Sequence, residues 1–450
     1  MKRFTALFLL TCLMVSLPAC NLEETSTISK DVSAAERVAS PTYPAGIAFD
    51  DYESRMANRN SNPVSRTSRD AVNAFSYKTA APILNTISVN GCYSPLSLYY
   101  ALALTGTGAN GQTQDELLDL LGASDAASLS QDMSNLYRLL YADNKITQLK
   151  IANSLWLDNE YRGEPVSFKD SFTQNAASQF YASLFKVDFA QPSAGEAMAE
   201  WIAENTNGTL KPAFAADPEQ IMSIINTIYF RDEWMDRFKV DQTKPDTFHL
   251  ADGKDVTCDF MNMAYNSHGF SKGDGYIRSA LSLKSGAQMV FVLPDQGVDL
   301  MALVSDPDNL KALFEGGKAT NGKVIWQIPK FSYDSKFELS DMMKKLGVTA
   351  PFEQNADFTG ITDHQAFISM ISQNTHIAID ENGVTASAFT KIDFAGAAMP
   401  VDQAEMILDR PFLYAIYSSP VSVTRVEGQS DPGTPMGNLL FIGICGNPLK

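Results

Sequence analysis

The chain has helix-like spacing of apolar residues in its first half and strand-like apolar runs in its second half. Ser94 followed by Pro95 predicts the start of an apolar helix, because serine can cap free amides and proline fits a first turn. A second helix is predicted with Thr113 and Glu116 as a capping box and Gly122 just beyond its end. Strands are predicted at 149–157, 221–230, 276–283, 287–294, 323–331, 375–380, 404–408, 412–417 and 438–445. The pattern predicts an α+β fold with large sheets in one domain.

One further stretch, 381–400 with the sequence ENGVTASAFTKIDFAGAAMP, alternates like a strand with one buried face. The apolar or small row consists of Val384, Ala386, Ala388, Thr390, Ile392 and Phe394. The opposite row is mixed, and the stretch lies between two stronger strands. The sequence therefore places the pattern of a core strand in a segment that otherwise resembles an exposed connection.

The chain is long and acidic. Its 450 residues are 45% hydrophobic, which is enough for a large core, and no repeat or linker divides 70–450. The formal net charge of −17 argues against nucleic-acid binding, because phosphate recognition needs a basic face. The charge indicates a soluble acidic surface.

The first 69 residues predict export and anchoring. Residues 1–19 have the basic start, short apolar run and small residue of a secretory signal peptide, and the run is too short to span a membrane comfortably. The sequence LPAC at 17–20 resembles a bacterial lipobox, so Cys20 is expected to carry lipid and to anchor the protein to a bacterial outer membrane or cell surface. The alternative is an ordinary cleavage site with an incidental cysteine. Residues 20–69 are polar and are expected to form a lipidated flexible tether.

The residue pattern predicts no enzyme. Cys92, Cys258 and Cys445 are expected to be mainly buried apolar residues, although one disulfide of unspecified pairing stays open. The sequence has no Cys/His cluster, no HExxH and no GxSxG, so neither a metal site nor a hydrolase triad is predicted, and no cofactor is expected. The glycine spacing at 106–111 matches a dinucleotide loop but follows a helix, so a connection between helices is predicted.

Nine segments occur in an order and at a spacing that resemble the serpin family of serine protease inhibitors. They are NGCYSPLSLYYALALTGTGANGQTQDEL, IANSLW, WIAENTNGTL, IINTIYFRDEW, QIPKFSYDSKFELSDMMKKLGV, FEQNADFTGI, IAIDENGVTASAFT, DRPFLYAIY and NLLFIGICGNP. The resemblance covers residues 70–450, the predicted serpin domain. It implies a serpin fold with three β-sheets, eight to nine helices and an exposed reactive loop near the C-terminus, at about 381–403.

The resemblance also implies a mechanism. A protease attacks the reactive loop and forms an acyl-enzyme, the cut loop inserts as a new central strand of the largest sheet, and the protease is distorted before it can deacylate. The implied hinge residues are Glu381, Gly383, Val384, Thr385, Ala386, Ser387, Ala388 and Thr390. The segment from Gly383 to Thr390 contains no proline and no charge, which favours an inhibitory member, although Phe389 is larger than the family's usual alanine. The alternative is a non-inhibitory serpin that acts as a binding or carrier module.

The bait bond follows from counting along the family's pattern. The hinge glutamate is normally seventeenth before the cut, so Glu381 places the cut between Ala397 and Ala398. The next choice is the bond from Ala398 to Met399. A small apolar residue before the cut suits elastase-like or subtilisin-like serine proteases, which are the expected partners. Papain-like cysteine proteases are further candidates. The protein itself is expected to be a monomer.

The resemblance implies two regions that control opening of the sheet. Ser94, Ser97 and Asn226 match the shutter, a buried polar group beneath the sheet. Gln373 stands where many serpins carry histidine, and glutamine can still donate and accept hydrogen bonds. Trp234 matches the breach, the end of the sheet at which insertion starts.

Overall fold

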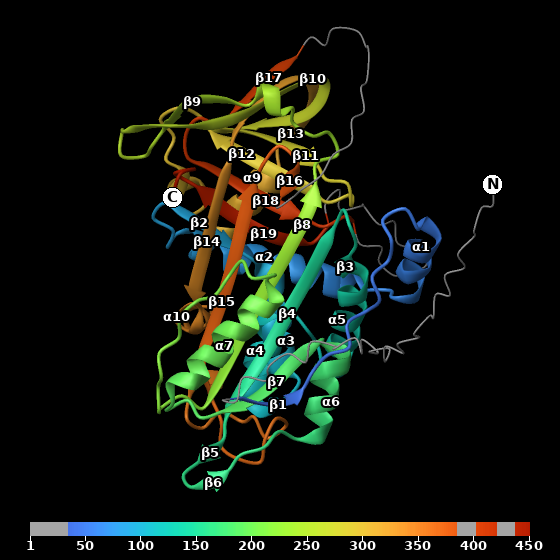
Figure 1. Ribbon diagram of the computed structural model, residues 1–450, viewed down its shortest axis with the longest axis vertical. Coiled ribbons are helices and arrows are strands. Elements are labelled where there is room, and N and C mark those ends of the chain that lie inside the picture. The colour runs from blue at the N-terminus through green and yellow to red at the C-terminus, as the bar shows by residue number, and fades with distance from the viewer. Residues whose placement is uncertain (1–34, 385–401, 421–436) are drawn as a thin grey trace, which may run out of the picture. The chain divides into compact units, whose positions relative to one another are not determined.

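The computed structural model describes residues 35–384, 402–420 and 437–450, which form ten α-helices, two 3₁₀ helices and three β-sheets (Figure 1). The helix count exceeds the expected eight to nine, and two of the ten are short, with four residues in α8 and six in α10. The α-helices are α1 Tyr52–Ser61, α2 Arg66–Leu84, α3 Pro95–Gly106, α4 Gly111–Leu121, α5 Ala126–Leu140, α6 Asp170–Gln179, α7 Pro192–Asn205, α8 Leu300–Leu303, α9 Pro307–Glu315 and α10 Ser340–Lys345. The 3₁₀ helices are η1 Val240–Gln242 and η2 Ala350–Phe352.

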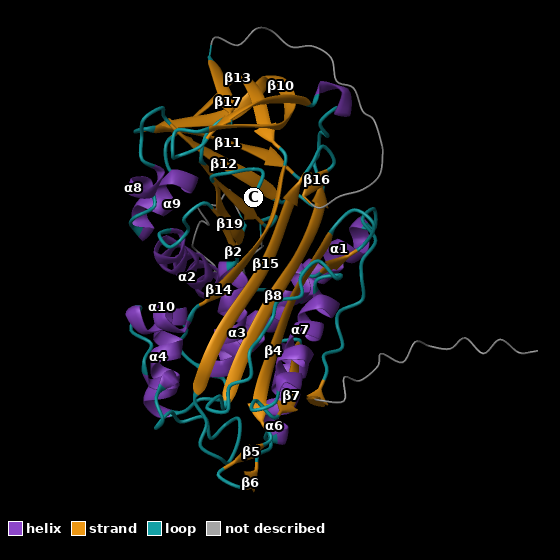
Figure 2. Cartoon of the chain, turned by 60° about the vertical axis from the view of Figure 1, so that its left-hand side comes forward, coloured by secondary structure: helices purple, strands orange, loops and turns teal. Residues whose placement is uncertain are grey.

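The eight-stranded sheet has the order β1-β7-β4-β8-β16-β15-β14, with β3 paired to β4. Its strands are β1 Ala35–Ala39, β3 Ala142–Asp143, β4 Gln148–Asp158, β7 Ala182–Val187, β8 Met222–Glu233, β14 Phe331–Glu338, β15 Ile368–Ile379 and β16 Gly383–Val384. In Figures 1 and 2, α7 covers one face of the long strands and α3 lies on the other. Because both faces are covered, β8 is a nearly continuous apolar run, as its sequence predicted.

The nine-stranded sheet has the order β17-β13-β10-β11-β12-β18-β19-β2, with β9 paired to β10. Its strands are β2 Asn90–Tyr93, β9 Lys244–His249, β10 Asp255–Gly273, β11 Tyr276–Ser282, β12 Gln288–Pro294, β13 Lys318–Pro329, β17 Gln403–Ile407, β18 Phe412–Tyr417 and β19 Leu439–Cys445. A third sheet contains β5 Glu160–Tyr161 and β6 Glu164–Pro165. All nine predicted strand runs fall within observed strands or overlap them.

The prediction of a flexible tether over 20–69 is wrong for residues 35–69. Strand β1 pairs antiparallel with β7, from Ala35 opposite Val187 onward. Farther along, the Tyr43 ring stacks on Tyr141 with ring centres 5.9 Å apart. The segment contains few apolar residues, but the ladder to β7 supplies backbone hydrogen bonds that composition alone does not reveal. Residues 20–34, with Cys20, lie outside the described residues.

The capping box predicted for α4 is absent, although the helix itself is present. Thr113 accepts a hydrogen bond from the Asp357 amide at 2.9 Å, and Glu116 accepts one from the Ala350 amide at 2.7 Å. Both side chains therefore satisfy amides of a distant segment instead of their own helix. Gly122 has a φ of 63° and closes the helix as predicted.

The three domain cysteines, Cys92, Cys258 and Cys445, are free and buried. The alternative of a disulfide among them is therefore excluded in this structure, and burial raises the pKa of the Cys258 thiol to about 11. The stretch 106–111 connects α3 to α4 as predicted. Within the described ranges, no helix combines the length and apolar character needed to cross a membrane.

Candidate functional site

The chain reverses direction immediately after β15 and re-enters the eight-stranded sheet. Gly383 and Val384 form β16, which pairs antiparallel with β15 on one side and with β8 on the other. Val384 lies opposite both Ile379 and Asp232, and its side chain is buried. Two residues of the predicted hinge thus already occupy a place between two long strands of the sheet.

Gly383 is required at this position by close packing. A Cβ atom added to it would lie 2.1 Å from the carbonyl oxygen of Asp232 and 2.7 Å from the Cα of Glu233. The turn before it is fixed by the Asp380 carboxylate, which accepts a hydrogen bond from the Asn382 amide at 2.8 Å. A side chain at residue 383 would therefore push β16 away from β8.

The two strands beside β16 are separated only near that end. Farther along, β15 pairs directly with β8 in a parallel ladder that runs from Ile368 opposite Met222 to Asn374 opposite Thr227. Extending β16 by further residues would require these direct pairs to be exchanged for new ones. Strand β16 therefore separates β15 from β8 at one end of the sheet, and the two strands pair directly beyond it.

Glu381 anchors the hinge turn in a buried polar site. Its carboxylate accepts hydrogen bonds from Thr243 Oγ1 at 2.8 Å and pairs with Lys330 Nζ at 3.0 Å. Burial opposes ionisation of Glu381, but hydrogen bonds from the backbone, Lys330 and Thr243 outweigh it and keep its pKa below the usual value. The ion pair of Glu381 therefore connects the hinge turn to Lys330, which lies between β13 and β14.

Trp234 holds the same turn from the end of β8. Its backbone amide donates to the carbonyl oxygen of Asn382 at 2.9 Å, and its indole Nε1 donates to the carbonyl oxygen of Asp380 at 2.9 Å. The ring is 1% exposed. The structure thus places Trp234 against the hinge, at the end of the sheet where the resemblance implied a breach.

Three of the four residues assigned to the shutter make one hydrogen-bonded group beneath the sheet. Gln373 Oε1 accepts from the Ser94 amide at 2.8 Å, and Gln373 Nε2 donates to the Ser94 carbonyl at 2.8 Å and to Asn226 Oδ1 at 3.2 Å. Ser94 also caps α3, and its hydroxyl donates to the Leu440 carbonyl at 2.7 Å. The group joins the start of α3 to β15 and β8.

The fourth shutter residue, Ser97, does not contribute its side chain to this group. Its amide donates weakly to Ser94 Oγ at 3.4 Å, but among the described residues its buried hydroxyl has no hydrogen-bond partner. The structure thus brings Ser94, Asn226 and Gln373 together and leaves the hydroxyl of Ser97 outside their hydrogen bonds. The role of these residues as a shutter stays a prediction from the resemblance.

The comparisons with known proteins identify the family. A family model described as Serpin (serine protease inhibitor) matches residues 70–428. The chain belongs to the serpin family. As a family, serpins are inhibitors rather than catalytic enzymes and form complexes with target proteases. Serpin-ZXA of Oryza sativa subsp. japonica is 28% identical over 382 residues, covering 80% of this chain and 90% of the relative. Serpin-ZX of Arabidopsis thaliana is 28% identical over 389 residues, covering 81% and 98%.

Solved serpin structures share the fold. The native state of the thermophilic serpin tengpin has a TM-score of 0.72 at 24% identity and covers 92% of this chain and all of its own. AtSerpin1 of Arabidopsis, in a native stressed conformation, has a TM-score of 0.71 at 26% identity and covers 85% and 98%. Human thyroxine-binding globulin in complex with thyroxine has a TM-score of 0.73 at 20% identity, which shows likeness of fold alone. The serpin fold predicted from the sequence is confirmed.

Several predicted site residues of this serpin lie outside the described residues. These are the bait candidates Ala397, Ala398 and Met399 and the hinge residues Thr385, Ala386, Ser387, Ala388 and Thr390. The described part of the hinge comprises Glu381, Gly383 and Val384. The assignments of the other residues stay predictions from the sequence.

Asp232 is a site residue that the sequence reasoning missed. It lies opposite Val384, has no exposed surface, and accepts hydrogen bonds from Thr147 Oγ1 at 3.0 Å and from the Ser285 amide at 3.3 Å. Burial raises its pKa to about 6, despite these hydrogen bonds. The only signal in the sequence was an acidic pair at the end of an apolar strand.

Glu233, the second acid of that pair, forms a buried three-member ion cluster. Its Oε2 lies 2.7 Å from Arg237 and 2.5 Å from Lys284. Burial opposes its ionisation, but the two cations outweigh that effect and lower its pKa. The pKa values of these adjacent carboxylates are therefore shifted in opposite directions, upward for Asp232 and downward for Glu233.

We expect charge reversal at Glu381 to destabilise the hinge and a matched reversal to restore it. Glu381→Lys places two ammonium groups next to each other. The free energy of unfolding should fall by about 2–3 kcal/mol. This loss is smaller than for a fully buried pair because the Lys330 side chain is 37% exposed. Adding Lys330→Glu should recover at least half of the loss. Urea unfolding midpoints of the wild type, both single variants and the double variant measure the coupling. Additive losses in the double variant would show that the pair does not hold the hinge.

Asp232 should make stability fall as the pH rises through its titration range. Its folded pKa, about 6, exceeds the usual aspartate value of 3.8, so the folded state binds the proton more tightly. Its stabilising contribution is complete below pH 3.8 and is lost between pH 3.8 and about 6, amounting to about 3 kcal/mol. The difference in urea midpoint between wild type and Asp232→Asn isolates this group. A difference that does not vary between pH 4 and pH 7 would contradict the assignment.

Proposed function

We propose that this serpin is a suicide-substrate inhibitor of serine proteases, not a catalyst, and that it traps them by inserting the cut reactive loop between β8 and β15. The observation that carries the proposal is the pairing of Gly383 and Val384 between those two strands. The loop enters the sheet in the direction that an inserted strand would need.

The register of β16 supports insertion of the segment that follows it. Val384 is opposite Asp232 on β8 and opposite Ile379 on β15. Continued residue by residue, the same register would place Thr390 between Asn226 and Gln373, and Phe394 opposite Met222, the first residue of β8. The insertable strand would then be as long as β8.

The same register supports burial of the apolar row. Residues directly opposite in an antiparallel pair project to the same face of a sheet. The row that starts at Val384 and ends at Phe394 would therefore share the face of Asp232, Phe230, Ile228, Asn226, Ile224 and Met222, which are all buried. The alternation in 381–400 fits a strand that occupies this face after cleavage.

The energy available from insertion is large enough to drive an irreversible trap. A strand of this length would add about ten ladder hydrogen bonds at roughly 0.5–1.5 kcal/mol each, and burial of the apolar row adds to that. The sum is similar to the whole stability of an ordinary domain, about 5–15 kcal/mol.

We place the bait bond between Ala397 and Ala398, with the bond from Ala398 to Met399 as the second choice. A small apolar residue before the cut suits elastase-like or subtilisin-like proteases and not a trypsin-like pocket, which needs Lys or Arg. Papain-like cysteine proteases are further targets of the same loop. The complex is expected to contain one serpin and one protease.

Incubation of the purified protein with pancreatic elastase, subtilisin and trypsin tests the function. We expect a covalent complex with elastase or subtilisin that survives denaturing electrophoresis, and a released peptide whose mass maps the cut to Ala397. Clean cleavage without complex would favour the non-inhibitory alternative, a binding or carrier role like that of thyroxine-binding globulin. Complex formation with trypsin alone would contradict the assigned bait bond.

We also propose that the protein is exported and held at a bacterial outer membrane or cell surface by lipid on Cys20. The support is the basic and apolar start of residues 1–19 and the sequence LPAC at 17–20. Labelling of expressing bacteria with a radioactive fatty acid should mark the wild type and not Cys20→Ser. Equal labelling of both proteins would contradict the anchor.

A further inference from the structure

A cleft of about 510 Å³ separates α1 from the body of the domain. Its walls come from α1 and the segment before it, from the end of α5, and from strands of both large sheets. Leu140, Leu149, Phe230 and Leu440 form part of its apolar lining. Its volume is in the range of sites that bind small organic molecules, and its lining combines polar and apolar side chains.

The charge of the cleft differs from that of the protein. Its lining includes Arg55 and Arg59 and no carboxylate, although the whole chain carries a formal charge of −17. Asp51, the N-cap of α1, accepts a hydrogen bond from the Ser54 amide, and Glu53 lies in the first turn of the helix, but neither carboxylate lines the cleft. The charged side chains that line the cleft are therefore cationic, on an acidic molecule, and charge complementarity favours an anionic occupant.

Arg55 is held in position by aromatic rings. Its guanidinium carbon lies 5.4 Å from the centre of the Phe49 ring and 4.6 Å from the centre of the Tyr52 ring. Stacking on ring faces leaves the planar edge of a guanidinium available for two parallel hydrogen bonds to a carboxylate. Among the described residues, neither Arg55 nor Arg59 forms an ion pair that would occupy that edge.

The rim of the cleft also exposes apolar surface. Tyr52 is 69% exposed and Met56 is 66% exposed, and α1 contains no buried residue. A ten-residue helix of this kind is marginal by itself, so apolar cover on this side would stabilise it. The cleft thus combines uncovered apolar groups with two arginines, of which Arg55 is stacked on aromatic rings.

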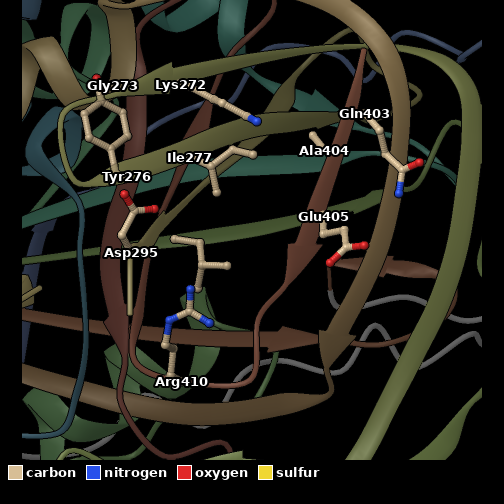
Figure 3. A pocket seen from close by; sticks show the side chains of 10 residues that line it. Lys272, Gly273, Tyr276, Ile277, Asp295, Gln403, Ala404, Glu405 and Arg410 are labelled. Atoms are coloured by element: carbon tan, nitrogen blue, oxygen red, sulfur yellow. The ribbon is translucent and has the colours of Figure 1, made fainter. Parts of the chain in front are cut away.

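A second cavity, of about 580 Å³, provides a contrast. It lies beside β17, and Figure 3 shows side chains of both signs around it. Lys272 and Arg410 are offset there by Asp295 and Glu405, and Arg410 already donates to the Pro294 carbonyl. The lining of this second cavity therefore favours neither an anionic nor a cationic ligand, whereas the lining of the α1 cleft favours an anion.

We propose that the α1 cleft binds a hydrophobic monocarboxylate, with its carboxylate on Arg55 and Arg59 and its apolar part against Leu140, Leu149 and Phe230. The chemical class follows from the one-sided charge and the apolar walls. The lining also includes Thr147 and Ser285, which donate hydrogen bonds to Asp232 beside the hinge. The proposal for this cleft does not rest on the proposed inhibitory function.

Isothermal titration calorimetry of the purified protein with decanoate tests the proposal. We expect saturable binding to the wild type and about tenfold or greater weakening in the double variant Arg55→Gln/Arg59→Gln, because charge-assisted hydrogen bonds are lost. Arg162→Gln is the matched control, since Arg162 also stacks on a ring, at 5.0 Å from Tyr161, but lies in the distant β5–β6 turn. The control should bind decanoate within about twofold of the wild type.

Two further measurements make the result independent of folding defects in the double variant. Ala142→Leu narrows the cleft and keeps both arginines, so it should also weaken decanoate binding. The uncharged ligand decanol should bind the wild type more weakly than decanoate does and should not respond to Arg55→Gln/Arg59→Gln. The proposal is overturned by equal affinities of the wild type and the double variant for decanoate, or by the absence of saturable binding in the millimolar range.

Discussion

Replacing Thr390 by proline should convert this serpin from an inhibitor into a substrate. The register of β16 would bring residue 390 between Asn226 and Gln373, in the middle of the sheet. Proline there removes a ladder hydrogen bond and clashes with its neighbours, which delays insertion. The acyl-enzyme is then hydrolysed before the loop has inserted, and active protease is released. We expect roughly a tenfold or greater rise in the number of serpin molecules consumed per protease inhibited, measured by titration of elastase or subtilisin activity.

The matched control for this variant is Val401→Pro, because Val401 lies on the other side of the predicted bait bond and would not belong to the proposed inserted strand. It should retain covalent complex formation. Both variants should be cut at the same bond, as mass spectrometry of the released peptide would show. Unchanged complex yield in Thr390→Pro would mean that trapping does not depend on insertion in the register of β16.

Replacing Gln373 by alanine should destabilise the closed sheet by about 3 kcal/mol or more. The side chain is fully buried and satisfies the amide and carbonyl of Ser94 and the side chain of Asn226. Alanine leaves these groups without a partner, at about 1–3 kcal/mol for each buried group. The urea midpoint of the intact protein measures the loss.

The same substitution should also speed spontaneous insertion of the uncut loop, because the hydrogen bond from Gln373 to Asn226 connects β15 to β8 where the strands must part. Inhibitory activity should therefore decay faster on storage at 37 °C than in the wild type. Gln365→Ala is the control, since Gln365 is exposed, and it should change stability by less than about 0.5 kcal/mol. Equal rates of loss of inhibitory activity in Gln373→Ala and Gln365→Ala would show that the hydrogen bonds of Gln373 do not keep the sheet closed.

Structural features could be predicted from the sequence where the local residue pattern agrees with the order of segments typical of serpins. Strand β8 was predicted because it is a long apolar run, but only the last part of β15 was predicted, at 375–380, because polar residues interrupt the strand before it. The hinge at Glu381 and Gly383 was predicted from the resemblance. The shutter contact between Ser94 and Gln373 joins residues 279 positions apart, which no periodicity predicts. Only the resemblance to a known fold brought them together.

The remaining features depend on tertiary partners. Strand β1 forms because β7 offers a free edge, so the polar composition of residues 35–69 gave a wrong prediction. Glu116 bonds the amide of Ala350, 234 positions away, in place of its own helix. The partners of Asp232, Thr147 and Ser285, lie 85 and 53 positions from it. The electrostatic environment of a buried carboxylate is set by such contacts and cannot be read from its neighbours in the chain.

The most direct test of the account is the thermal stability of the protein before and after cleavage within 385–401 by a protease that is not trapped. Insertion of the cut loop would add about ten ladder hydrogen bonds and a buried apolar row, so the unfolding midpoint should rise by roughly 10 °C or more. The gain should be smaller in Thr390→Pro than in the wild type. A midpoint that stays the same or falls after cleavage would contradict the central claim that this segment becomes a strand of the eight-stranded sheet.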